Sequence, residues 1–139
     1  MPFHRTDDPE FWNNTPAARR DSHDRAASAG WKISMYPLGD DAADDDAPLA
    51  VLMYIPPGGV LPRHKHACHR VEVMVQGSLD IGEGRTMHPG DVHTSDPDRF
   101  YGPHTAGPDG SLTVEIFSAA RGLVGETPEG EVTRAVPIT

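Results

Sequence analysis

The feature that most constrains this chain is a histidine-rich strip between Gly58 and Gly77, which we interpret as extended backbone. The nine residues 64–72 contain three histidines and one glutamate, and the first two histidines, His64 and His66, lie two positions apart. Side chains at positions i and i+2 of a β-strand project from the same face. Two imidazoles are therefore expected to point into one space, which is the arrangement that a metal site needs.

The rest of the chain has the pattern of many short strands. Of the 139 residues 37% are hydrophobic, and Gly and Pro number 14 each, a composition that favours turns over helices. Residues 31–37 and 111–118 alternate apolar with other residues, 49–55 is apolar throughout, and 60–66 is a strand that carries the histidine pair. Roughly eight to ten short strands are expected, which is typical of an all-β sandwich or barrel.

Glycine and proline mark where these strands should end. A two-residue hairpin turn is expected at residues 77–78, and a second turn at residues 107–110. In the strand 111–118, Leu112, Val114 and Ile116 share one face, and other side chains occupy the second face.

The length fits one domain. We expect three parts: an N-terminal arm over 1–30 that is partly helical or disordered, a β-barrel over 31–118, and a C-terminal extension over 119–139. A short helix is expected over 17–29 and an edge strand over 131–136. The aspartate-rich segment 39–46 lacks the spacing of a calcium loop and is expected to be a solvated loop.

Charge and composition exclude several classes of function. The formal net charge of −9 argues against binding to nucleic acid, which requires a basic surface. No apolar run approaches the roughly 20 residues that cross a bilayer. Cys68 is the only cysteine, so an intrachain disulfide is excluded, and the first residues have no apolar signal region. We expect a cytoplasmic protein.

The chain resembles the cupins, a family of small antiparallel β-barrels, or jelly rolls, with two short motifs. The first motif is a glycine, five residues, His-x-His, three or four residues, a glutamate, six residues and a second glycine. Here Gly58 is followed after five residues by His64-Lys65-His66, and Gly77 stands at the second glycine. The second motif begins with a Gly-Asp turn, matched by residues 89–92, and ends with a histidine, matched by His104.

One position departs from the first motif. Arg70 stands where the glutamate belongs, and Glu72 follows two residues later. Arginine has no lone pair to give to a metal. Either a bulge near residues 68–69 makes Glu72 a ligand, or the centre has three histidines with Glu72 or Arg70 beside them. We favour three histidines with Glu72 as a weaker or absent fourth ligand. The metal ligands expected are His64, His66, His104 and Glu72.

The resemblance implies a metal-dependent enzyme that acts on a small oxygenated organic molecule. We favour an oxidoreductase, a non-haem Fe(II) dioxygenase of the diketone or hydroxy-ketone type, with Zn, Mn or Ni as alternative ions. Arg70 and Tyr101 are expected in the substrate pocket, and His69, His88 and His93 at the surface or rim. A non-catalytic metal- or ligand-binding sensor, or a metal-assisted isomerase, lyase or cyclase, are alternatives. The expected partners are the substrate and a second copy of the chain in a homodimer.

Overall fold

The computed structural model describes residues 2–17, 20–38, 45–123, 125–130 and 132–133. The helical elements are η1 (Phe11–Asn13), α1 (Arg20–Ser28) and η3 (Ala120–Leu123). The strands are β1 (Lys32–Pro37), β2 (Leu49–Ile55), β3 (Val60–Leu61), β4 (Lys65–His66), β5 (Arg70–Gly82), β6 (Arg85–Met87), β7 (Val92–Ser95), β8 (His104–Phe117), β9 (Gly125–Glu126) and β10 (Val132–Thr133). Most of the aspartate-rich segment and of the expected edge strand, residues 39–44, 131 and 134–136, lies outside the described residues.

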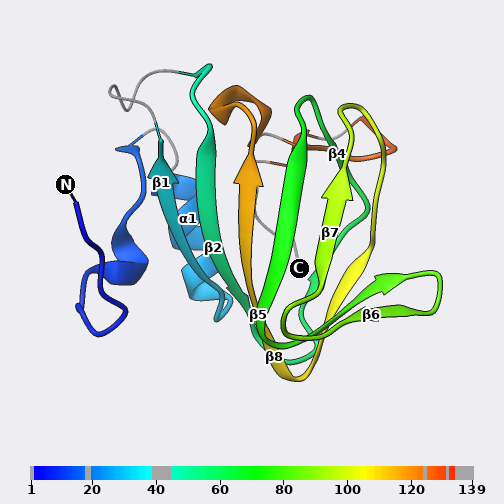
Figure 1. The fold of residues 1–139 in the computed structure, drawn as a ribbon, viewed down its shortest axis with the longest axis horizontal. Coiled ribbons are helices and arrows are strands. Elements are labelled where there is room, and N and C mark those ends of the chain that lie inside the picture. The colour runs from blue at the N-terminus through cyan, green and yellow to red at the C-terminus, as the bar shows by residue number, and fades with distance from the viewer. Residues whose placement is uncertain (1, 18–19, 39–44, 124, 131, 134–139) are drawn as a thin grey trace.

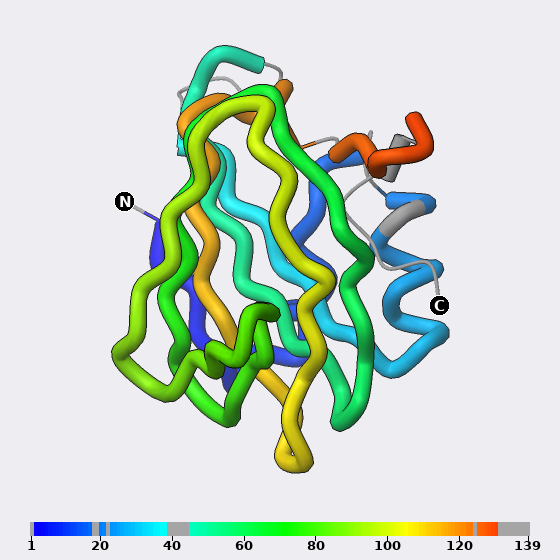
Figure 2. The backbone as a smooth tube through the Cα atoms, turned by 90° about the vertical axis from the view of Figure 1, so that its right-hand side faces the viewer, coloured from blue at the N-terminus to red at the C-terminus, as the bar shows by residue number. Residues whose placement is uncertain are grey.

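The strands form two antiparallel sheets. The larger has the order β1-β2-β8-β5-β6, with β3 also paired to β8 and β7 to β5, and the smaller has the order β10-β9-β4. Within the described strands this pairing does not close into a ring, although the all-β jelly-roll architecture is as expected. In Figure 1 the helix α1 lies behind the larger sheet, and Figure 2 shows α1 and residues 125–130 on the same side of the molecule.

The first strands confirm the pattern seen in the sequence. The strand expected over 31–37 is β1, and the one expected over 49–55 is β2 with those bounds. In β2 alternate side chains are buried, from Leu49 to Ile55, and α1 packs against β1 with Ala26 buried. These residues join Trp31 and Leu79 in one hydrophobic core, whose burial is the main driving force for folding.

The hairpin turn expected at residues 77–78 is wrong, because β5 runs through it. Residues 107–110 lie within the bounds of β8, but all four stand opposite Ser78 alone, since Ala106 pairs with Leu79 and Ser111 with Gly77. Gly77 faces Ser111 across the ladder, and the register shifts on both sides of Gly77. A β-carbon at position 77 would clash with the carbonyl oxygen of Gly110, and the backbone there has φ of 81°. Glycine therefore permits a bulge that bends two paired strands together, where a chain reversal was expected.

The two faces of β8 differ in an informative way. Leu112, Val114 and Ile116 share one face as expected, but that face is the outer one, with Ile116 39% exposed. The inner face carries Thr113 and Glu115, both buried. Burying an unpaired polar group costs free energy. Polar residues at inner positions therefore indicate a functional site at this end of the interior.

No helix in the described part of the chain is long and apolar enough to cross a membrane.

Candidate metal centre

The histidine pair is positioned by a short, broken strand. The single strand expected over 60–66 is divided into β3 and β4, and Pro62, which has no N–H to donate, follows β3 directly. The backbone of His64 pairs instead with Tyr101, through N–H···O=C bonds of 3.0 and 2.9 Å. The alternation survives this interruption, since His64 and His66 are only 4% and 5% exposed. Both imidazoles point inward, as expected.

Backbone carbonyl groups hold both imidazoles in one tautomer. His64 Nδ1 lies 2.7 Å from the carbonyl oxygen of Pro62, and His66 Nδ1 lies 2.8 Å from that of Gly122. A carbonyl oxygen only accepts, so each Nδ1 carries the hydrogen and each neutral ring leaves a lone pair on Nε2. A carbonyl partner of this kind commonly orients histidines that bind metals.

The two Nε2 atoms lie 3.1 Å apart. With both hydrogens on Nδ1, no hydrogen bond can join them, and two lone pairs face each other. Histidine nitrogens bind ions such as zinc at about 2.0–2.1 Å, so two adjacent ligands at a right angle would be about 3 Å apart. The donor chemistry and the spacing of this pair therefore fit a metal ion.

Burial keeps the histidines neutral, which is the form that binds metals. Loss of solvation lowers the pKa of His64, and together with the charges of neighbouring groups it lowers the pKa of His66 to about 3. The same cause, reinforced by Arg70, lowers the pKa of His104 to about 2. These three rings are available as ligands throughout the physiological range.

His104 enters the same interior from β8. Its side chain is 1% exposed, and neither ring nitrogen has a hydrogen-bond partner among the described residues. A buried imidazole with both nitrogens unpartnered is rare in a folded protein and fits the ligand role expected of it.

Tyr101 separates this third histidine from the pair. Its ring contacts all three histidine rings, with centroid distances of 4.5 Å to His64, 6.0 Å to His66 and 5.2 Å to His104. Its hydroxyl donates to Nε2 of His64 at 2.8 Å. Within the described residues, no three His, Cys, Asp or Glu side chains converge closely enough to hold an ion. A three-histidine centre therefore requires the hydroxyl of Tyr101 to leave His64.

Arg70 and Glu72 share the inner face of β5, as the period of two predicts. Both are buried, and Arg70 Nη2 lies 2.7 Å from Glu72 Oε1, although the angle is not that of a hydrogen bond. Arg70 Nε donates to Oε2 of Glu115 at 2.7 Å, and Nη1 donates to Ser95 at 3.2 Å. Its guanidinium carbon also lies 4.4 Å from the centre of the Tyr101 ring. Arg70 thus occupies the middle of a polar cluster with one cation and two carboxylates.

The charges of this cluster depend on one another. Burial alone would lower the pKa of Arg70, but Glu115 and Glu72 raise it, so the guanidinium stays charged. Burial raises the pKa of Glu115, and Arg70 opposes that rise. In this geometry the carboxylate of Glu72 lies beside the guanidinium of Arg70. Ligation of a metal ion by Glu72 stays a prediction. The same geometry disfavours direct contact between Arg70 and a substrate.

Two residues of the site were missed by reasoning from the sequence. Glu115 had no role assigned, and His93 was expected at the surface or rim. Glu72 faces His93 on β7 and Glu115 on β8, so the three form one row across adjacent strands. The alternation of β7 places His93 inward, but only the register places it beside Glu72. His69 and His88 are at the surface as expected, with side chains 71% and 69% exposed.

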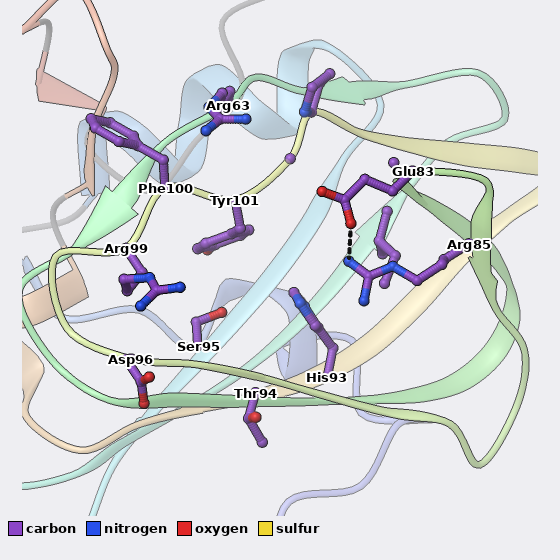
Figure 3. Close-up of a pocket in the computed structure, with 14 residues that line it drawn as sticks. Arg63, Glu83, Arg85, His93, Thr94, Ser95, Asp96, Arg99, Phe100 and Tyr101 are labelled. Carbon is purple, nitrogen blue, oxygen red and sulfur yellow. Dashed lines mark ion pairs between the residues drawn. The ribbon is translucent and has the colours of Figure 1, made fainter.

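A cavity of about 400 Å³ opens above this cluster. Tyr101, His93 and Ser95 are among the residues that line it, and the substrate role expected of Tyr101 stays a prediction. In Figure 3 Arg99, on the loop before Tyr101, and Arg85, on β6, reach toward the same space from opposite sides. Arg70 does not line it.

Comparison with known proteins identifies the fold. No protein-family model and no curated protein sequence matches the chain. Among solved structures, KdgF from Halomonas sp. is 24% identical, with 64% of this chain and 78% of that chain covered at a TM-score of 0.53. An RmlC-like cupin from Shewanella frigidimarina is 22% identical, with 66% and 78% covered at a TM-score of 0.55.

A third similar structure belongs to a larger protein. Oxalate decarboxylase from Bacillus subtilis is 15% identical, with 65% of this chain and 25% of that chain covered at a TM-score of 0.53. These structures share the strand architecture described above, and their identities are too low to carry over an activity. The fold of this chain is the antiparallel jelly roll of these cupin structures.

Proposed function

We propose that the chain is a metal-dependent enzyme acting on a small oxygenated organic molecule, with His64, His66 and His104 as the ligands. The observation that carries this proposal is the 3.1 Å separation of two Nε2 atoms whose Nδ1 atoms both donate to carbonyl groups. That arrangement brings two Nε2 lone pairs close together, one of which accepts from Tyr101, and a divalent ion that displaces this hydroxyl is a partner that neutral imidazoles accept.

Within this proposal we favour Fe(II) and dioxygenase chemistry on an enolised diketone or a hydroxy-ketone. An ion held by neutral histidines keeps its full positive charge, which favours an anionic, chelating substrate. When bound, the ion would supply Lewis-acid polarisation of a substrate oxygen and access to dioxygen chemistry. Arg70 already compensates the negative charge of Glu72, so the proposal does not require Glu72 as a metal ligand.

The chain's own residues would position the substrate. Tyr101 is at once a wall of the cavity and the hydrogen-bond donor to His64, so its hydroxyl is placed between the cavity and the histidine pair. Burial raises the pKa of Tyr101 well above its ordinary value, so the phenol stays protonated and acts as a donor. His93 lines the same cavity, and its imidazole ring is placed to contact a bound molecule.

The test combines elemental analysis with oxygen uptake. We expect the protein purified without added metal to contain iron and to consume oxygen with a panel of diketones and hydroxy-ketones. Zinc with no oxygen uptake would contradict the dioxygenase and favour the isomerase, lyase or cyclase alternative. Protein with no bound metal, even after incubation with each candidate ion, would contradict the metal-dependent function itself.

We also propose a homodimer that buries the outer face of the larger sheet. Val114 on β8 pairs with Leu52 on β2 and with Val73 on β5, which in turn pairs with Val92 on β7. This row crosses four strands without a charge, and Val92 is 60% exposed. An apolar face of this extent is typical of an interface. No nucleic acid or membrane is among the proposed partners, and a cytoplasmic location stays a prediction.

Replacing Val114 with lysine is expected to convert the dimer to a monomer. The substitution places a charge at the centre of the apolar row, and burying an unpaired charge is strongly unfavourable. Light scattering coupled to size exclusion measures the mass of each species, and Thr105→Lys on the other half of β8 serves as the control. A wild-type protein that is monomeric at high concentration would contradict the proposed dimer.

A further inference from the structure

The rim of the cavity carries a concentration of positive charge that the metal centre does not require. Arg63, Arg85 and Arg99 line it, against the two carboxylates of Glu83 and Asp96. The chain as a whole has a formal net charge of −9, so the excess of arginines at the cavity is opposite in sign to the net charge of the protein. An excess of one sign of charge in a cleft raises the local concentration of oppositely charged ligands.

Two of the three guanidinium groups have no carboxylate partner among the described residues. Arg85 is paired with Glu83 at 3.3 Å. Arg63 lies over the ring of Phe100, with 5.8 Å from its guanidinium carbon to the ring centre. Arg99 has no such contact, and in Figure 3 its guanidinium points into the cavity. Arg63 and Arg99 are therefore free to pair with an anion.

The nearby carboxylate of Asp96 does not compensate them. Asp96 Oδ1 lies 3.9 Å from His69 Nδ1, and Figure 3 shows the Asp96 side chain directed away from the space that Arg99 enters. The inner wall adds a neutral donor, because Ser95 accepts a hydrogen bond from Arg70 and keeps its own hydroxyl hydrogen. Donors thus outnumber acceptors around the cavity.

We propose that this cavity binds a small organic acid, with its carboxylate groups held by Arg63 and Arg99 and the rest of the molecule directed toward Tyr101. Guanidinium groups match carboxylates in a planar, two-bond geometry. A volume of about 400 Å³ is at the lower end of the range of ligand sites, which limits the acid to a small molecule. This inference rests on the proposed function, because it takes the cavity as the substrate site of that enzyme.

Calorimetric titration at low salt tests the inference with defined probes. We expect malonate or succinate to bind the protein as purified, the neutral diamides of the same acids to bind at least tenfold more weakly, and binding of the acids to weaken as salt screens the charges. In the Arg63→Gln, Arg99→Gln double variant we expect affinity for the acid to fall about 10- to 100-fold, because charge-assisted hydrogen bonds are lost.

A matched control removes the same charge elsewhere. Arg25→Gln with Lys32→Gln alters exposed residues of α1 and β1, which do not line the cavity, and is expected to bind the acids as wild type does. The inference would be overturned if neither acid bound, or if acid and diamide bound equally. It would also be overturned if the double variant kept its affinity, or if inorganic phosphate bound through the arginines while the acids did not.

Metal content measured on the same samples separates this inference from the proposed function. The double variant is expected to keep the wild-type metal content, since neither guanidinium group is a hydrogen-bond partner of the His64 or His66 imidazole. Loss of arginine-dependent acid binding with metal retained would overturn only the organic-acid inference. A wild-type protein without metal that still binds the acids through Arg63 and Arg99 would overturn only the metal-dependent function.

Discussion

Replacing His64 with alanine is expected to abolish metal uptake by the protein. The substitution removes one of the two Nε2 atoms that lie 3.1 Å apart, and it leaves His66 without the second ligand of the pair. Changing a residue that merely supports a metal ligand typically lowers affinity about 10- to 100-fold, so loss of the ligand itself should cost at least as much. Elemental analysis and competition with a chelator measure this directly.

Stability provides a second measurement of the same prediction. Metal binding to the folded state alone raises the free energy of unfolding, by about 2.7 kcal/mol when the free ion is at 100 times its dissociation constant. Chelator treatment should therefore lower the melting temperature of the wild type and leave that of His64→Ala unchanged.

The matched control is His88→Ala, which removes an exposed histidine with a side chain 69% accessible. It is expected to keep the wild-type metal content and the wild-type response to chelator. If His64→Ala bound metal as well as this control does, the histidine pair would not be the metal centre.

Replacing Arg70 with methionine is expected to destabilise the fold by about 3–5 kcal/mol, which is the usual cost of breaking a buried ion pair from one side. Glu72 and Glu115 are both buried, and Arg70 is the cation that compensates them. Urea denaturation at neutral pH measures the loss. Metal content should be retained, because Arg70 is not a ligand.

The pH dependence of this variant follows from Glu115. Burial already raises its pKa, and removal of Arg70 removes a group that lowers it. A carboxyl group with a pKa higher in the folded than in the unfolded state makes the fold less stable as the pH rises between the two values. The deficit of Arg70→Met should therefore be largest at neutral pH and should shrink as the pH falls toward the ordinary pKa of glutamate.

Two further variants make this result specific. Adding Glu115→Gln to Arg70→Met removes one uncompensated charge and should recover part of the stability. Arg85→Met removes an exposed arginine that is 58% accessible and paired with one carboxylate, and should cost no more than about 1 kcal/mol. Equal losses for Arg70→Met and Arg85→Met would show that the buried cluster has no special electrostatic role.

Much of the architecture follows from local patterns in the chain. The period of two predicts that His64 and His66 point inward, and that Arg70 and Glu72 share a face, because side-chain direction in a strand depends only on the backbone. The bounds of β2 follow from its continuous apolar run. The hairpin expected at 77–78 fails because glycine permits both a reversal and a bulge, and only pairing between β5 and β8 selects the bulge.

The strip between Gly58 and Gly77 therefore determines by itself that two imidazoles share one interior. What surrounds them is decided only by the tertiary structure. The register of β5 against β7 and β8 brings His93 and Glu115 to Glu72, and the backbone pairing of His64 with Tyr101 places a hydroxyl at Nε2. These contacts join residues far apart in sequence, and a periodic pattern within one strand carries no information about its register with another.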